Sequence, residues 1–145
     1  MARARIMLAD DHRQLLEAEA ALLEPHFEIV GAVRDGSMLV TEALRLRPDV
    51  IVTDITMPAL TGIDAIQRLK DSDFSPKIVI LTIHSEKEFL NACMNEGALG
   101  YVVKSRMKAH LVPAIHAAWS AKFTFPRSDS YRVTTSNVDS LRKWR

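Results

Sequence analysis

Short apolar runs alternate with helical patterns five times along the first 122 residues of this 145-residue chain. The runs are rich in Val and Ile and are flanked by turn-forming residues, which is typical of buried strands. They occupy residues 5–9, 27–33, 50–54, 77–82 and 99–103. Strands and helices that alternate at this spacing predict a parallel sheet covered by helices on both faces, with right-handed crossovers. The common order of five such strands is 2-1-3-4-5.

Between the runs, apolar residues recur at helical spacing, and cap residues mark several helix ends. We expect helices over about residues 15–23, 37–46, 61–70, 85–97 and 108–121. Ser37 is a candidate N-terminal cap, and Thr61 and Ser85 each precede an acidic residue by three positions, the spacing of a capping box. Gly97 is well placed to end its helix as a C-terminal cap.

Residues 127–145 break the alternation and differ in charge from the rest of the chain. They contain 5 Lys and Arg against 2 Asp and Glu, whereas residues 1–126 contain 14 against 16. We therefore predict one domain over residues 1–122 and a linker or C-terminal tail, largely irregular, over 123–145. The nineteen residues after Pro126 are too few for a helix-turn-helix with its own core.

Composition excludes several classes of protein. The net charge is +1, which points to neither nucleic acid nor an anionic membrane as a ligand of the whole chain. No apolar run approaches transmembrane length, and the first run is too short for a signal peptide. The single cysteine, Cys93, excludes an internal disulfide and fits a reducing compartment. We expect a cytoplasmic protein without a membrane partner.

Polar residues stand at the ends of four predicted strands. Asp10 and Asp11 follow the first, Asp54 ends the third, Thr82 ends the fourth and Lys104 follows the fifth. In the order 2-1-3-4-5 these strands lie side by side, so their carboxyl ends converge on one edge, where open α/β sheets bind ligands.

The chemistry of this set favours phosphoryl transfer. Crowded carboxylates repel one another unless a cation neutralises them, and Mg²⁺ takes carboxylate, carbonyl, water and phosphate oxygens. Asp54 has the place of a carboxylate nucleophile towards phosphorus, which would give an acyl phosphate. The Lys104 ammonium adds a fixed positive charge, and the Thr82 hydroxyl can donate to a phosphoryl oxygen. Each residue alone is more often a turn residue or a solvated side chain, so the hypothesis rests on the set.

These residues resemble the response-regulator receiver domains of two-component signalling. The resemblance spans roughly residues 4–122 and rests on Asp10-Asp11, Asp54 in Asp-Ile-Thr-Met-Pro, Gly62, Thr82, and Tyr101 with Lys104 in Gly-Tyr-Val-Val-Lys. The Gly-Tyr-Val-Val-Lys-Ser stretch and the Lys-Phe-Thr-Phe-Pro ending at Pro126 are most similar to the LuxR/NarL-type transcriptional regulators.

The resemblance implies a flavodoxin-like (βα)5 fold and a switch rather than a turnover enzyme. A sensor histidine kinase would phosphorylate Asp54. Mg²⁺ or Mn²⁺ would bind Asp11, Asp54 and the Thr56 backbone carbonyl, with Asp10 acting mostly through water. Lys104 would contact the phosphoryl group.

The same resemblance implies how the switch responds. Thr82 would move towards the phosphoryl group and Tyr101 would turn inward behind it, which changes the face formed by residues 85–121. A homodimer through that face, or through its last helix with Trp119, is an expected partner. DNA would be bound only through an effector domain outside this chain.

Three alternatives remain open. One is a stand-alone or degenerate receiver that acts as a dimerisation module without DNA output. A second is an aspartate-nucleophile phosphatase, which usually has a second Asp two residues after the nucleophile, where this chain has Thr56. A flavodoxin-like cofactor binder is weaker, because an acidic edge repels a flavin phosphate. His12 and His84 lie beside the predicted site, either as modulators or as solvated loop residues.

Overall fold

The protein is described by a computed structural model over residues 3–121, in which five strands alternate with five α-helices. The strands are β1 (Arg5–Ala9), β2 (Glu28–Val33), β3 (Val50–Thr53), β4 (Lys77–Thr82) and β5 (Gly100–Val103). The helices are α1 (Arg13–Leu23), α2 (Gly36–Leu46), α3 (Gly62–Lys70), α4 (Lys87–Asn95), the 3-10 turn η1 (Lys104–Arg106) and α5 (Met107–Ser120). The predicted tail over 123–145 lies outside the described residues.

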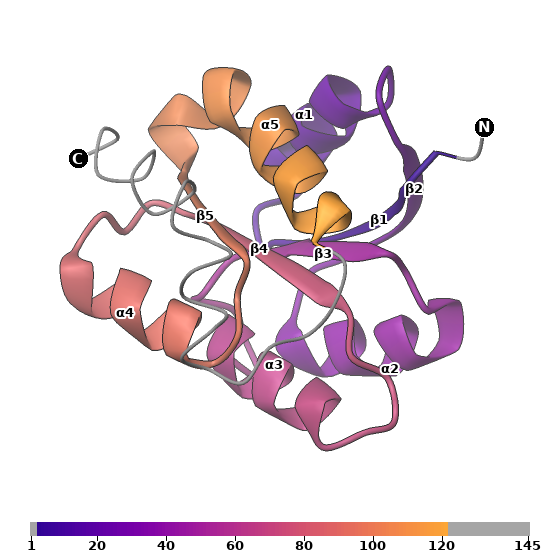
Figure 1. Cartoon of the computed structure of the whole chain (residues 1–145), viewed down its shortest axis with the longest axis vertical. Coiled ribbons are helices and arrows are strands. Elements are labelled where there is room, and N and C mark those ends of the chain that lie inside the picture. The colour runs from indigo at the N-terminus through magenta and orange to yellow at the C-terminus, as the bar shows by residue number, and fades with distance from the viewer. Residues whose placement is uncertain (1–2, 122–145) are drawn as a thin grey trace.

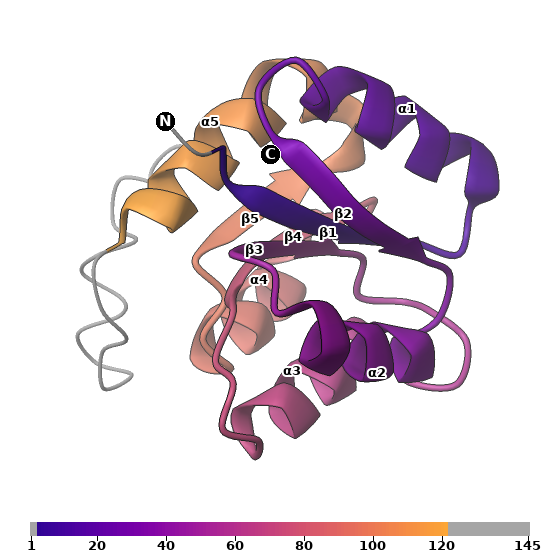
Figure 2. The same cartoon turned by 90° about the vertical axis from the view of Figure 1, so that its right-hand side faces the viewer.

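The five strands form one parallel sheet in the order β2-β1-β3-β4-β5, as the alternation predicted. Helices α1 and α5 cover one face, and α2, α3 and α4 cover the other (Figures 1 and 2). This is the flavodoxin-like arrangement. The order turns back between β1 and β3, which places the candidate site at the carboxyl ends of these two strands.

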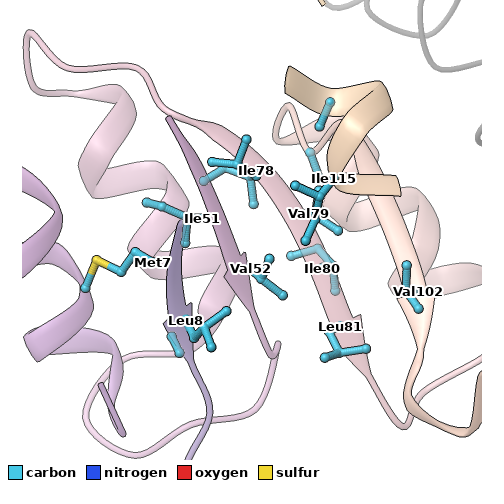
Figure 3. Packing of buried hydrophobic residues seen from close by; sticks show 14 of the residues in the cluster. Met7, Leu8, Ile51, Val52, Ile78, Val79, Ile80, Leu81, Val102 and Ile115 are labelled. Atoms are coloured by element: carbon cyan, nitrogen blue, oxygen red, sulfur yellow. The ribbon is translucent and has the colours of Figure 1, made fainter. Parts of the chain in front are cut away.

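The core is continuous across the sheet because the central strands are buried on both faces. All residues of β3 and β5 are buried, and so are five of the six residues of β4. Figure 3 shows Ile51, Val52, Val79 and Ile80 on neighbouring strands, with Ile115 of α5 against β4. Double-sided burial explains why these strands are uninterrupted apolar runs rather than alternating patterns.

The helix caps confirm part of the sequence prediction and correct the rest. Thr61 caps α3 by accepting a hydrogen bond from the Asp64 amide at 3.1 Å. The Ser37 prediction is wrong, because Asp35 caps α2 by accepting from the Met38 amide at 2.7 Å. The Ser85 prediction is also wrong, because α4 begins after Glu86, which makes no side-chain cap bond.

Gly97 ends α4 as predicted. Its φ angle is +104°, its amide donates to the Met94 carbonyl, and the Ala98 amide donates to the Cys93 carbonyl. This pair of bonds is a Schellman motif, in which glycine adopts the left-handed conformation without the strain of a Cβ atom. Cys93 itself is fully buried, as a core thiol should be.

Lys77 ties the beginning of β4 to the end of α5. Its Nζ donates to the Trp119 carbonyl at 2.7 Å and also to the Ala121 carbonyl. An ammonium at the carboxyl end of a helix is favourable for the helix dipole and satisfies carbonyls that lack intrahelical partners.

Within residues 3–121, no helix is long and apolar enough to span a membrane.

Gly62 holds the loop after β3 against the first turn of α3. Its amide donates to the Ile55 carbonyl at 2.7 Å, and a Cβ atom at this position would lie 2.1 Å from the Asp54 carbonyl oxygen. Backbone atoms cannot yield as a side-chain end can, so only glycine fits here without moving the loop that carries Asp54.

We expect Gly62→Ala to lower the free energy of unfolding by roughly 3 kcal/mol, because the added methyl group must displace backbone. Urea unfolding measures this loss. Gly31→Ala is the matched control, since its Cβ would meet only the flexible end of Leu46, at 2.9 Å. Equal losses in the two variants would contradict the close-approach argument.

Candidate functional site

The two central carboxylates are fixed by sheet hydrogen bonds that continue one residue beyond the strands. The Asp10 amide donates to the Val33 carbonyl at 3.1 Å, and the Asp54 amide donates to the Ala9 carbonyl at 3.1 Å. Both residues are buried, with relative exposures of 1% for Asp10 and 5% for Asp54. The structure therefore brings these carboxylates together at the predicted edge of the sheet.

Lys104 bridges the two carboxylates. It is the first residue of η1, directly after β5, and its Nζ lies 2.6 Å from Asp10 Oδ2 and 2.7 Å from Asp54 Oδ2. Burial acts to lower the pKa of Lys104, but hydrogen bonds to both carboxylates outweigh it and raise that pKa above its ordinary value. The bridging group is therefore a charged ammonium.

The Asp54 carboxylate has a defined orientation. Its Oδ1 accepts from the Ile55 amide at 2.7 Å, while its Oδ2 faces Lys104. The Thr53 hydroxyl donates to the Asp54 backbone carbonyl at 3.0 Å. The Asp54 carboxylate is thus held by an amide on one oxygen and by an ammonium on the other, which aligns it as a nucleophile requires.

Asp11 and His12 extend the acidic cluster outwards. His12 donates its amide to Asp10 Oδ1 at 2.8 Å, and its Nδ1 lies 3.1 Å from Asp11 Oδ1 and 3.3 Å from Asp10 Oδ1. Ligand atoms of Asp10, Asp11 and His12 all lie within 4.8 Å of one another, which is close enough to share one metal ion. The imidazole itself is largely exposed.

These residues fit a divalent cation with oxygen ligands. Asp11 Oδ1 is buried and accepts no hydrogen bond from the described part of the chain. Asp10, Asp11 and Asp54 contribute three negative charges, Lys104 supplies one positive charge, and two negative charges remain. An oxygen-rich site with this excess matches the preferences of Mg²⁺. The cluster whose ligand atoms lie close together consists of Asp10, Asp11 and His12, so the predicted ligand roles of Asp54 and of the Thr56 carbonyl stay predictions.

Thr82 and Tyr101 meet at the backbone of His84, in the loop between β4 and α4. The His84 amide donates to Thr82 Oγ1 at 3.4 Å, and the Tyr101 hydroxyl donates to the His84 carbonyl at 2.7 Å. Thr82 is fully buried and Tyr101 is 2% exposed, so the tyrosine ring points inward. The His84 ring stacks on Phe89 of α4, with ring centroids 4.2 Å apart. One loop residue thus links the two predicted switch residues to α4.

One buried acid near the site was not predicted from the sequence. Glu19 lies on α1 with Leu16 and Leu23 on the side that faces the core, and it is 1% exposed. Burial and the charge of Asp10 raise the pKa of Glu19 to about 8, with a smaller opposing effect from Lys104. The signal was present, since Glu19 occupies an inward position of the helical repeat where an apolar residue is expected.

Comparison with known proteins places these features in a family. The family described as "Response regulator receiver domain" matches residues 6–116. The transcriptional regulatory protein LiaR of Bacillus subtilis is 36% identical over 116 residues, which is 79% of this chain and 55% of LiaR. The nitrate/nitrite response regulator NarL of Escherichia coli K12 is 30% identical over 117 residues, 79% of this chain and 54% of NarL. The chain spans about half the length of the curated relatives it matches.

Solved structures of response regulators share the fold of this chain. A LuxR-family two-component response regulator from Aurantimonas sp. SI85-9A1 superposes with a TM-score of 0.79 at 31% identity, covering 97% of this chain and 99% of that one. The isolated receiver domain of RcsB from Salmonella enterica, determined with the phosphomimetic BeF3⁻, superposes with a TM-score of 0.75 at 27% identity, covering 90% and 98%.

The buried Glu19 makes folding stability depend on pH. The folded pKa of Glu19 is about 8 and its ordinary value is 4.5, so the folded state binds more protons than the unfolded state between these values. Stability therefore falls as the pH rises from 4.5 to 8, by roughly 3 kcal/mol at pH 7. Glu19→Gln should remove this slope, and urea unfolding at several pH values without added metal measures it.

Glu17→Gln is the control for this prediction, because Glu17 is on the same helix but its side chain is 71% exposed. Its stability curve should run parallel to the wild-type curve across this pH range. A Glu19→Gln curve that also ran parallel would show that Glu19 is already ionised in the folded protein.

Proposed function

The chain belongs to the response regulator receiver family, and from this premise we propose that a sensor histidine kinase phosphorylates it on Asp54. The observation that carries the proposal is the Asp54 carboxylate itself. It is 5% exposed and held by the Ile55 amide and the Lys104 ammonium at the carboxyl edge of the sheet. Two-component signalling is the process in which a carboxylate of this kind serves as a phosphoacceptor.

The proposed reaction is a displacement at phosphorus. A carboxylate oxygen of Asp54 attacks the phosphorus of a phosphohistidine, the new O–P bond forms as the P–N bond breaks, and the imidazole leaves with the bonding electrons. Lys104, 2.7 Å from Asp54 Oδ2, is placed to hold negative charge on the transferring group. This is a self-modification rather than the turnover of an external substrate.

Asp10, Asp11 and Asp54, with the Thr56 carbonyl, are the residues that would hold Mg²⁺ or Mn²⁺. Such an ion would neutralise charge on the phosphoryl oxygens during transfer. The chain's own contribution is the placement of its carboxylates: Asp10 is fixed by the His12 amide and Lys104, and Asp11 is half-buried at the mouth of the site.

Phosphorylation of Asp54 would be transmitted through Thr82 and Tyr101. The Thr82 hydroxyl would exchange its contact with the His84 amide, at 3.4 Å, for a phosphoryl oxygen. Tyr101 holds the carbonyl of the same residue, so a shift of this loop would move α4 relative to β5. The two arrangements form a two-state element that local charge biases.

The output that we propose is control of transcription. The relatives LiaR and MctR are named as transcriptional regulatory proteins, and this chain spans about half of their length. The DNA-binding function would therefore reside in an effector domain outside this chain. A homodimer through the α4-β5-α5 face or through α5 would present two such domains. One neighbouring structure shows two RcsB dimers bound to two parallel DNAs, which supports this arrangement for the fold. A cytoplasmic location fits this role.

Asp54→Asn should abolish covalent phosphorylation by acetyl phosphate with Mg²⁺, because the amide is not a nucleophile towards phosphorus. Intact-mass spectrometry should show one phosphoryl group on the wild-type protein, removed by hydroxylamine as an acyl phosphate is. Asp71→Asn, at the exposed end of α3, is the matched control and should be phosphorylated normally. Equal labelling of wild type and Asp54→Asn would overturn the proposal.

Thr82→Val keeps the shape of a buried side chain but removes its hydroxyl. We expect Asp54 to remain modifiable, whereas the NMR shift changes that beryllofluoride and Mg²⁺ produce around Tyr101 and α4 should be largely lost. Thr41→Val, on the exposed side of α2, should leave the wild-type response intact. A full response in Thr82→Val would exclude Thr82 as the switch.

A further inference from the structure

Glu19 is a buried acid that the proposed phosphotransfer does not use. It projects from α1 into the core, is 1% exposed, and its Oε2 has no hydrogen-bond partner within residues 3–121. A buried ionised carboxylate without a partner is strongly disfavoured, so such a group takes up a proton instead. Neutral Glu19 is therefore the expected form when no cation is bound nearby.

Three charged groups act on Glu19, from the ends of three strands. Asp10 and Asp54 disfavour its ionisation, and Lys104 favours it. The ammonium bridges both aspartates, at 2.6 and 2.7 Å, and its favourable effect on an ionised Glu19 is smaller than the opposing effects of burial and of Asp10. Within residues 3–121, Glu19 makes no hydrogen bond to any of the three, so they act on it through space.

Other elements near α1 add little charge. Helix α1 also packs on β2, whose one charged residue, Glu28, is exposed at the amino end of the strand. Helix α5 covers the same face of the sheet (Figure 1). Its residues Lys108 and His116 are exposed, and His110 is half-buried. The protonation of Glu19 is therefore governed by the charge balance at the carboxyl edge of the sheet.

We propose that Glu19 couples proton binding to divalent-cation binding: it holds a proton while the acidic site lacks its cation and releases it to solvent when the cation binds. This inference rests on the proposed function for the existence of the metal site. A divalent ion among Asp10, Asp11 and Asp54 would offset the negative charges that oppose ionisation of Glu19. It would also weaken the ion pairs between these aspartates and Lys104. The O–H bond of Glu19 then breaks and its proton passes to the buffer.

Linkage gives the coupling a direction. If a proton leaves when Mg²⁺ binds, Mg²⁺ affinity must rise with pH across the range in which Glu19 is protonated in the free protein. One released proton sets an upper limit of tenfold in affinity per pH unit. Phosphorylation at a given Mg²⁺ concentration would then be more efficient in mildly alkaline than in mildly acidic conditions.

The test measures Mg²⁺ binding by isothermal titration calorimetry between pH 6.5 and 8.5, in two buffers with different ionisation enthalpies. We expect wild-type affinity to rise roughly three- to tenfold across this range, with net proton release. Glu19→Gln should bind Mg²⁺ with a clearly smaller rise and correspondingly less proton release. Glu17→Gln, a change of the same type on the exposed side of α1, should behave like wild type.

His12 also lies close to Asp10 and Asp11, so the comparison is repeated in His12→Asn protein with and without Glu19→Gln. The proton release that remains in His12→Asn and disappears on adding Glu19→Gln belongs to Glu19. Glu19→Leu, which removes the carboxyl group and suits the core, guards against an effect peculiar to glutamine and should match Glu19→Gln.

The outcomes separate this inference from the proposed function. Saturable Mg²⁺ binding whose pH dependence is the same in wild type and Glu19→Gln overturns the coupling and leaves the phosphoacceptor site intact. Absence of saturable Mg²⁺ binding in the wild-type protein at every pH overturns the metal site and the coupling together.

Discussion

The ammonium of Lys104, held between Asp10 and Asp54, is the interaction on which the rest of the site depends. Without it, two carboxylates that are 1% and 5% exposed would repel each other with no cation between them. Removing one partner of such a buried group leaves an uncompensated charge, which is far more costly than the net gain from the intact pair. The position of Lys104 at the start of η1 thus places a positive charge between two residues that directly follow β1 and β3.

Lys104 carries a single positive charge, and two further acids, Asp11 and Glu19, lie outside its bridge to Asp10 and Asp54. Within the described residues, Asp11 has a buried oxygen that accepts no hydrogen bond, and the pKa of Glu19 is raised to about 8. Burial is the main cause of the raised pKa of Glu19, and the negative charge of Asp10 adds to it. Such an acidic edge favours a cationic ligand, and we infer that the protonation of Glu19 responds to the binding of that cation.

The sequence predicted the sheet order and the polar edge because both follow from simple rules. Parallel strands end at one side, so residues such as Asp54 and Lys104, fifty positions apart, could be brought together from spacing alone. The burial of Glu19 could not be predicted in this way. The helical repeat places Glu19 on the inward side of α1, but a glutamate at such a position is normally expected to be exposed. The predictions of caps at Ser37 and Ser85 were wrong because several polar residues lie near the start of each helix, and the geometry of the loop decides which of them is the cap.

Lys77 gives α5 a mechanical role. The helix leaves the site at η1, runs for 14 residues, about 21 Å, and is fastened at its far end where Lys77 holds the carbonyls of Trp119 and Ala121. A helix that is held at both ends against the same sheet resists fraying and moves as one rigid element. A change in the site that moves η1 would therefore move α5 as a whole.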